Sequence, residues 1–171
     1  MRKSALLIAT VLVLALAAQH GSAGAISTNI VISTNIHAKG GGVLATQELV
    51  SLEAKQVVGG AMGRFEFSGK TGDRLFNVAG NIDALTDLSG GRFDFWGVGV
   101  VRAFDGNGDP AYMAEVTYWG RGRDADNGGT LGDALFVHIH NGTFDHMTGT
   151  PGDLVPLKHG NLLKQIFRRA L

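Results

Sequence analysis

The sequence predicts an all-β fold with antiparallel strands, arranged either as a β-sandwich or as a small β-barrel. Several segments after residue 25 alternate between apolar and polar residues with the period of two that is typical of strands. The chain has 26 glycines but only 3 prolines, and the glycines separate the alternating segments instead of forming one low-complexity tract. No helical pattern of useful length occurs in this part of the chain, so short strands joined by tight turns are expected.

The first 25 residues have the organisation of a cleavable signal helix. The cationic residues Arg2 and Lys3 precede an apolar stretch at residues 5–18, and small residues end in Ala23-Gly24-Ala25. This order is typical of a secretory signal peptide, here of bacterial style. The apolar stretch is too short and wrongly flanked for a stable membrane span, and no later stretch reaches spanning length. We therefore expect a secreted or extracytoplasmic protein with no membrane span after cleavage.

Residues 26–42 are expected to form a lead-in segment or an edge strand, ahead of a single all-β domain at residues 43–171. A direct repeat, Ile-Ser-Thr-Asn-Ile, occupies residues 26–30 and again residues 32–36. Its β-branched residues favour an extended conformation. Three consecutive glycines at residues 40–42 then suggest a flexible joint.

The strands of the domain are expected in sequence order. One strand includes Phe65 and Phe67 on one face, and the next starts at Leu75. The longest alternation covers residues 91–102 and has apolar residues on both sides, so a central strand is expected there. Gly97 and Gly99, on the same side as Phe93 and Phe95, would let a neighbouring side chain lie flat on the sheet or let the strand coil. Further strands are expected at residues 111–119 and 134–140. The spacing of apolar residues at 160–171 fits both a strand and a short amphipathic helix, which leaves that segment open.

Composition excludes several classes of function. With no cysteine, the chain cannot form disulfides, thiolate metal sites or cysteine nucleophiles. The formal charge is zero at pH 7, so nothing favours nucleic acid, whose phosphates require a basic face. The basic residues Lys164, Arg168 and Arg169 are interpreted as a solvated tail.

His138 and His140 are candidate ligands for a transition metal, with His146 as the third. Residues two apart on a strand point to the same face, so the first two imidazoles should lie together. Asp145 and His146 follow just after the next turn. Such a set could hold zinc or copper. The alternative is that these histidines simply belong to a polar outer face of the sheet.

Two acidic loops are candidate calcium sites. In the loop at residues 121–133, Asp124, Asp126, Asp133 and the amide of Asn127 could supply the oxygen ligands that calcium prefers. The EF-hand spacing and its terminal glutamate are missing, and a polar turn whose acidic side chains bond the backbone is preferred. The loop at residues 105–110 begins like a calcium loop, but proline replaces the required glycine, so a hairpin turn is expected there.

Aromatic residues could form a ligand-binding surface. Trp96, Tyr112, Tyr118 and Trp119 would make a platform for sugars or apolar ligands if they were exposed on one face. The alternative is ordinary core packing. No nucleophile elbow, phosphate-binding glycine loop, zinc-protease helix or dinucleotide fingerprint is present, so no catalytic residue is assigned. Asn141-Gly142-Thr143 fits a glycosylation sequon but is interpreted as a turn.

Between residues 96 and 166 the order of these features resembles the small secreted bacterial β domains called post-COAP-1 domains. The chain departs from their pattern by Gly128-Gly129 in place of Gly-x-Pro-Gly and by its tryptophan-rich return strand. The resemblance implies a β architecture in an exported protein, without an established activity or catalytic residues. The matching motifs are Gly63-Arg64-Phe65-Glu66-Phe67, Gly97-Val98-Gly99-Val100, Asp105-Gly106-Asn107-Gly108, Ala114-Glu115-Val116-Thr117, Asp124 to Gly129 with Gly132-Asp133, and Gly160-Asn161-Leu162.

Three functions are compatible with these observations. The first is a non-catalytic extracellular β module that acts in surface association or ligand binding, with a cell-surface or matrix partner and no cofactor. The second is a secreted metal-dependent enzyme or metal carrier that uses the histidines. The third is a lipocalin-like barrel that holds a small apolar ligand, with Gly97 and Gly99 helping to open a cavity.

Overall fold

The computed structural model describes residues 32–125, 132–150 and 152–170. The predicted signal helix at residues 1–25 lies outside the described residues, as do Asp126 and Asn127 of the predicted calcium loop. In the ranges that are described, no helix has the length and apolar character needed to cross a membrane.

Strands make up the regular structure, and the described residues contain no α-helix, which confirms the predicted all-β fold. Glycines and polar residues form short turns between consecutive strands, and such turns keep the strands that they join antiparallel. The strands are β1 (Ile32–Leu44), β2 (Leu49–Val57), β3 (Gly60–Thr71), β4 (Arg74–Asp87), β5 (Arg92–Phe104), β6 (Pro110–Arg123), β7 (Ala134–His140), β8 (Asp145–Met147) and β9 (Val155–Ala170).

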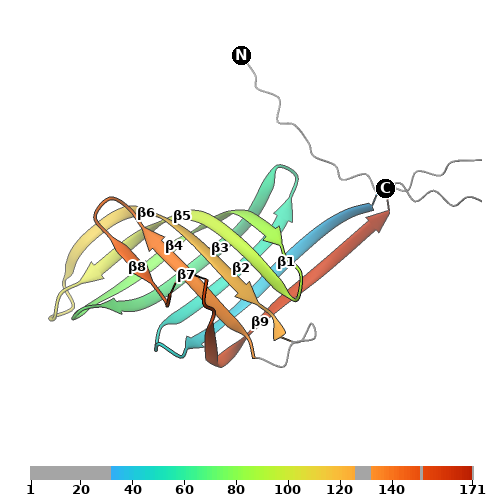
Figure 1. The fold of residues 1–171 in the computed structure, drawn as a ribbon. Coiled ribbons are helices and arrows are strands. Elements are labelled where there is room, and N and C mark those ends of the chain that lie inside the picture. Colours follow the sequence, from blue (N-terminus) through green and yellow to red (C-terminus); the bar gives the residue numbers. More distant parts are fainter. Residues whose placement is uncertain (1–31, 126–131, 151, 171) are drawn as a thin grey trace, which may run out of the picture.

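One nine-stranded antiparallel sheet closes on itself (Figure 1). Strands β1 to β6 form a meander in which each strand pairs with the next. Strand β7 pairs with β6, and β9 pairs with β1 along one edge and briefly with β7 along the other, which completes the ring. Strand β8 is a short addition that pairs with β7. Of the two predicted arrangements, the structure is therefore the small β-barrel.

The segment predicted as a lead-in or edge strand differs from the prediction. From Ile32 it forms β1, which pairs with β9 along its length and with β2 over residues 37–43. It therefore lies inside the sheet, and the predicted boundary at residue 43 falls within the strand. The glycines are not a joint but points of close backbone approach, since a Cβ atom added at Gly42 would lie 1.9 Å from the carbonyl oxygen of His159.

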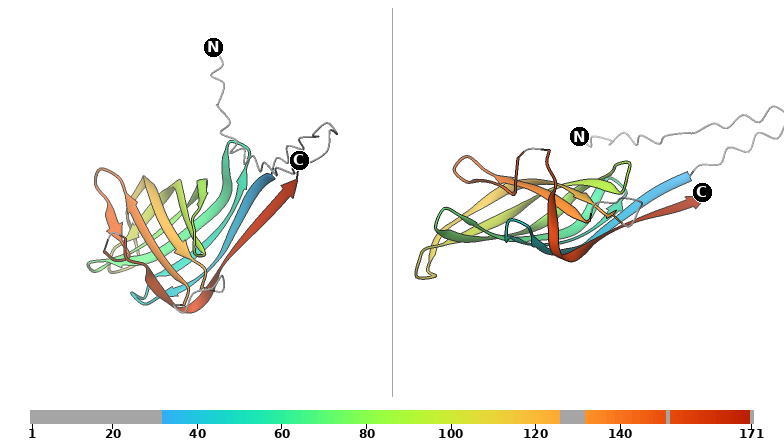
Figure 2. Two further views of the ribbon diagram at one scale, coloured as in Figure 1. Left: turned by 45° about the vertical axis from the view of Figure 1, so that its right-hand side comes forward. Right: turned by 60° about the horizontal axis from the view of Figure 1, so that its bottom comes forward.

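Beyond the end of β2, β1 and β9 continue together as a projecting two-stranded ribbon (Figures 1 and 2). Residues 32–36 pair there with residues 166–170. The C-terminal segment that the sequence left open between strand and helix is thus a strand. Its Phe167 side chain is more than half exposed on the ribbon.

Aromatic rings fill the interior of the barrel. Tyr118 and Phe95 point inward, and each lies over a glycine at the paired position of the adjacent strand, Gly97 and Gly120 respectively. A Cβ atom added at Gly97 would lie 2.6 Å from the Tyr118 hydroxyl oxygen, and one at Gly120 only 2.2 Å from the Phe95 ring. A side chain therefore lies flat over Gly97, as predicted. Glycine is needed at both positions because any Cβ atom would collide with the ring that covers it.

Two loops are closed by side-chain oxygens that accept hydrogen bonds from the backbone. At the β5–β6 turn, Asp105 Oδ1 accepts bonds from the N–H groups of Asn107 and Asp109, at 2.9 and 3.0 Å. At the β7–β8 turn, Asn141 Oδ1 accepts bonds from the N–H groups of Thr143 and Phe144, at 2.8 and 2.7 Å. Both loops are thus turns of the type that Asp and Asn form, as predicted.

Lys164 contradicts its interpretation as part of a solvated tail. Its side chain is only 3% exposed. It points to the same inner side of β9 as the fully buried Leu162 and reaches the β4–β5 turn. There Nζ donates to Asp87 Oδ1 at 2.7 Å and to the carbonyl oxygens of Leu88 and Arg92 at 2.9 and 3.1 Å. These acceptors compensate the ammonium group for the loss of water.

Candidate functional site

Trp96 and Trp119 lie at paired positions of β5 and β6, on the outer face of the barrel. Trp96 is 38% exposed, and Trp119 is half-buried, with its ring 5.0 Å from that of Phe136 on β7. We call Trp96 and Trp119 the tryptophan platform. Two indole rings next to each other on an exposed sheet face can stack against a flat or apolar ligand surface.

An ion pair holds a guanidinium against Trp119, one of the two rings of the tryptophan platform. The guanidinium of Arg121 lies 5.7 Å from the Trp119 ring, within cation–π range. Arg121 also binds the buried Asp94 in a bidentate manner, with Nε–Oδ1 and Nη2–Oδ2 distances of 2.6 and 2.7 Å. The hydrogen bonds to Asp94 raise the pKa of Arg121, so the guanidinium stays charged at any physiological pH. Trp119 is therefore held against a rigid group.

The two tyrosines among the predicted aromatic residues do not join the platform. Tyr118 lies in the core, where burial raises the pKa of its phenol well above the ordinary value and the charge of Asp83 raises it further. Tyr112 is on β6, and its hydroxyl reaches the β7–β8 turn, where it is 2.7 Å from Thr143 Oγ1 and accepts a bond from Asn141 Nδ2 at 3.2 Å. These two hydrogen bonds lower the pKa of Tyr112. The structure thus brings together two of the four predicted aromatic residues.

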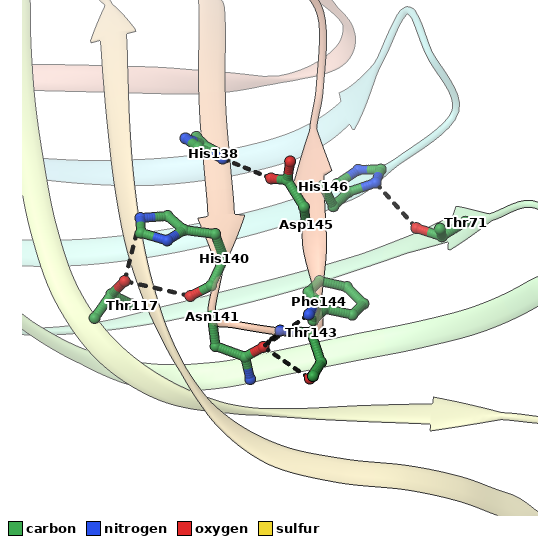
Figure 3. A network of polar contacts seen from close by, with 9 residues as sticks. All are labelled: Thr71, Thr117, His138, His140, Asn141, Thr143, Phe144, Asp145 and His146. Carbon is green, nitrogen blue, oxygen red and sulfur yellow. Dashed lines mark hydrogen bonds and ion pairs between the residues drawn. The ribbon is translucent and has the colours of Figure 1, made fainter.

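His138 and His140 share the outer face of β7, as their spacing predicts (Figure 3). Their ring centroids are 4.6 Å apart. His138 Nε2 is 2.7 Å from Asp145 Oδ1 on β8, and His140 Nε2 is 3.3 Å from Thr117 Oγ1 on β6. Each ring therefore has one nitrogen held by a neighbouring strand, and His138 lies beside Trp119 in the pairing of β6 with β7.

His146 does not lie with the other two histidines. It pairs with the buried Ile139, so its ring points to the inner side of the sheet, toward Thr71 (Figure 3). Its Nε2 is 2.8 Å from Glu48 Oε1, and its Nδ1 is 3.2 Å from Thr71 Oγ1. Among the described residues, no group of three His, Cys, Asp or Glu side chains is placed to hold a metal ion.

Glu48 and His146 form a carboxylate–imidazole pair at one end of the barrel, which no sequence pattern predicted. Both side chains are about 10% exposed, and the His146 ring packs edge-on against Phe76 with a centroid distance of 4.7 Å. The hydroxyl of Thr46 donates to the second oxygen of Glu48. Glu48 lies in the β1–β2 turn, 98 residues from His146, so only the closed topology brings the two together.

The acidic residues of the predicted calcium loop bind backbone N–H groups. Asp124 Oδ2 accepts from the N–H of Lys164, and Asp133 Oδ2 from that of Leu162, both at 2.7 Å. The other oxygen of Asp133 accepts from the N–H of Ala125 at 2.9 Å. Strand β9 has only two paired residues with β7, so these carboxylates replace a neighbouring strand along its edge. The bond to Ala125 lies within the loop, as the preferred polar turn predicts, whereas the bonds to Lys164 and Leu162 hold a distant strand, which the sequence did not predict.

A shallow groove lies on the outer face of β3, β4 and β5, with a volume of about 370 Å³. The inward side chains of Phe67 and Val78 are buried, so the groove surface is formed by outward residues. The sequence analysis missed this groove because its residues come from three strands and form no motif. The outward lining residues are Glu66, Ser68, Asn77, Ala79, Val100 and Arg102.

No family model, curated protein or solved structure matches this chain.

Proposed function

We propose that the chain is an exported, non-catalytic β module that binds an extended ligand on the tryptophan platform. The observation that carries this proposal is the pairing of Trp96 with Trp119 on the outer face of neighbouring strands, where Trp96 is 38% exposed. Buried aromatic rings pack the core, but these two large side chains lie on the outer face, and Trp119 is held against Arg121. Rigid, exposed aromatic residues are typical anchors of a binding surface.

The acidic residues support a binding module over an enzyme. The carboxylates of Asp105, Asp124 and Asp133 accept backbone hydrogen bonds, and that of Asp94 binds Arg121. Groups that are committed to such bonds stabilise the fold and are poorly placed to transfer protons to a substrate. Export is an independent part of the proposal and is supported by the sequence of residues 1–25.

Tryptophan fluorescence tests the binding surface directly, because Trp96 and Trp119 are the only tryptophans of the chain. We expect the mature protein to change its fluorescence when it is titrated with one member of a panel of oligosaccharides, phosphatidylcholine–phosphatidylglycerol vesicles and an extended proline-rich peptide. Trp96→Ala should weaken that binding about tenfold, as expected for loss of one aromatic contact of about 1.4 kcal/mol. The matched control Phe167→Ala, an exposed aromatic residue on the distant ribbon, should bind normally. No response to the panel, or equal binding by Trp96→Ala measured by calorimetry, would refute the proposal.

A second candidate function is transition-metal binding by His138 and His140, favoured by their 4.6 Å ring separation on one face. The Asp145 contact would fix the tautomer of His138, as carboxylates do for metal-binding histidines. Two imidazoles leave the remaining positions to water or an external ligand. Elemental analysis of protein purified without an affinity tag tests this function. A metal content well below one ion per chain, unchanged by His138→Ala, would remove it.

The lipocalin-like alternative has less support. It requires Gly97 to open space inside the barrel, and the Tyr118 ring occupies that space. Native mass spectrometry that detects a co-purified apolar ligand would restore this alternative.

A further inference from the structure

We propose that the groove on β3, β4 and β5 binds a sugar ring of a polysaccharide chain that continues onto the tryptophan platform. This inference rests on the proposed function and names the class of its ligand. Three observations support it: the order of polar and apolar side chains in the groove, the charge of the groove, and the line of exposed residues that joins the groove to the platform.

The strand register arranges the groove residues in two adjacent rows. Ser68 pairs with Asn77, which pairs with Arg102, and these three form a polar row across β3, β4 and β5. Two residues further along the strands, Ala79 pairs with Val100 and gives the next row a small apolar centre. Residues two apart on a strand are separated by about 7 Å, which is comparable to the width of one sugar ring.

The chemistry of the two rows matches a sugar. A pyranose has weakly polar ring faces and a rim of hydroxyls that both donate and accept hydrogen bonds. Ala79 and Val100 offer a flat apolar floor, and Val100 is 40% exposed. The Ser68 hydroxyl and the Asn77 amide can each donate and accept, whereas Arg102 only donates. A purely apolar ligand would leave these groups without hydrogen bonds, which costs free energy.

The described lining of the groove carries one positive charge that no carboxylate neutralises. The carboxylate of Glu66 is neutralised by Arg64, whose Nη2 lies 2.7 Å from its Oε1. In the described part of the chain, no acidic side chain forms an ion pair with Arg102, so one guanidinium faces the groove. A single cation suits a sugar hydroxyl or one carboxylate of a uronic acid, to which arginine can bind in a bidentate manner.

The groove and the tryptophan platform lie on one continuous face. The outward side chains of β5 run from Arg102 through Val100 and Val98 to Trp96. Val98 and Trp96 are 39% and 38% exposed, so apolar surface remains accessible along the whole strand. Six residues of strand span about 20 Å, which is the length of several linked sugars. A polysaccharide laid along β5 would therefore reach both sites at once.

Isothermal titration of the mature protein with cellohexaose, chitohexaose and hexagalacturonate tests the inference. We expect one of these hexasaccharides to bind, and Arg102→Ala and Asn77→Ala to weaken it at least tenfold. The matched control is Arg92→Ala, which removes the same side chain from the outward face of the same strand at its other end. Circular dichroism checks that all variants fold. If Arg102→Ala loses more affinity for hexagalacturonate than for the neutral sugars, and salt reduces this difference, Arg102 binds a carboxylate. If it loses the same affinity for neutral sugars, Arg102 binds a hydroxyl.

The outcomes separate this inference from the proposed function. If no hexasaccharide binds, or if both groove variants bind as tightly as the unmodified protein, the groove does not hold a sugar. If Trp96→Ala weakens binding and both groove variants bind normally, the groove is refuted as a sugar site and the proposed function of the tryptophan platform remains. Weakened binding in the groove variants with unchanged binding in Trp96→Ala would overturn the platform, and the groove would remain as the sugar site.

Discussion

Tyr118 shows how single residues determine the packing of this barrel. Its ring lies 4.4 Å from that of Phe65, centroid to centroid, and its hydroxyl donates to the backbone oxygen of Asn81. Both contacts require that the ring cross the backbone of the paired strand, which only a residue without a Cβ atom permits. Gly97 is therefore as much a part of the core as the ring that covers it.

Replacing Gly97 with alanine should destabilise the protein. The added Cβ atom would lie 1.9 Å from the carbonyl oxygen of Asn81 and would displace the Tyr118 ring. We expect a loss of about 2 kcal/mol or more in the free energy of unfolding, which is typical of overpacking in a core. Chemical denaturation measures this loss. Gly106→Ala is the matched control, since its Cβ atom would contact nothing within 4 Å; equal stabilities of the two variants would contradict the packing argument.

Residue parity explains which single-residue predictions failed. In a strand, the direction of a side chain depends on the register as well as on its position in the sequence. Gly97, in a long alternating segment, was placed correctly. Lys164 was not, because apolar residues occur on both sides of β9 and the pattern did not identify its inner face. Leu162 and Lys164 point the same way, and the acceptors at the distant β4–β5 connection, Asp87 and the carbonyl oxygens of Leu88 and Arg92, make burial of the lysine tolerable.

At the scale of elements, the short hairpin β7–β8 determines on which face of the sheet the His146 side chain lies. The Asn141 turn sets the register so that His146 pairs with Ile139 and points inward. A change of one residue in the turn would have put His146 on the outer face beside His138 and would have turned Asp145 inward. The sequence predicts that His138 and His140 share a face, which needs only the period of two. It cannot place His146, because that needs the turn geometry.

Acidic side chains, instead of a neighbouring strand, accept the backbone hydrogen bonds along part of one edge of β9. Removing one of these side chains tests their contribution to stability. Asp133→Ala removes the acceptors for the N–H groups of Leu162 and Ala125. We expect a loss of about 1–3 kcal/mol in stability, the cost of leaving a buried donor unsatisfied. The Leu162 amide should also exchange its hydrogen faster, which nuclear magnetic resonance can measure residue by residue. Asp133→Asn keeps one acceptor oxygen and should lose less; unchanged exchange in Asp133→Ala would show that water replaces the carboxylate.

At the scale of the whole molecule, the fold class was predictable but the closure of the ring was not. The alternation and the turns identify β3 to β7, whereas β1 was predicted only as a lead-in or edge segment and β2 was not predicted. The contacts of β9 with β1 and β7, and of Glu48 with His146, join parts of the chain that are far apart, and no local pattern carries that information. The tryptophan platform was predictable only in part. The alternation with period two shows which residues share a face with Trp96 or with Trp119 on its own strand. The β5–β6 register, which the sequence does not show, makes the two residues neighbours.

Export of the whole protein is a prediction from the sequence of residues 1–25. Expression of the full chain in a bacterial host should give a shortened protein outside the cytoplasm, with Ile26 as its first residue. Mass spectrometry of the purified product measures the cleavage point. Replacing Ala23 and Ala25 with bulky residues should block processing, whereas the same changes at Ala17 and Ala18 should not. A full-length protein retained in the cytoplasm would contradict export.

The pH dependence of the whole fold can be followed through its two tyrosines, since the chain has no others. Hydrogen bonds lower the pKa of Tyr112, so this phenol should ionise first, with the barrel intact. Burial raises the pKa of Tyr118 far above the value of about 10 that it has in an unfolded chain. The folded state therefore retains this proton longer, and the resulting stability is complete below about pH 10 and decreases as the pH rises further. Phenolate absorbance and circular dichroism, recorded together, should show one ionisation before unfolding and the second only with it. Tyr112→Phe should remove the first step and Tyr118→Phe the second; ionisation of both phenols in the folded state would mean that Tyr118 is not sealed in the core.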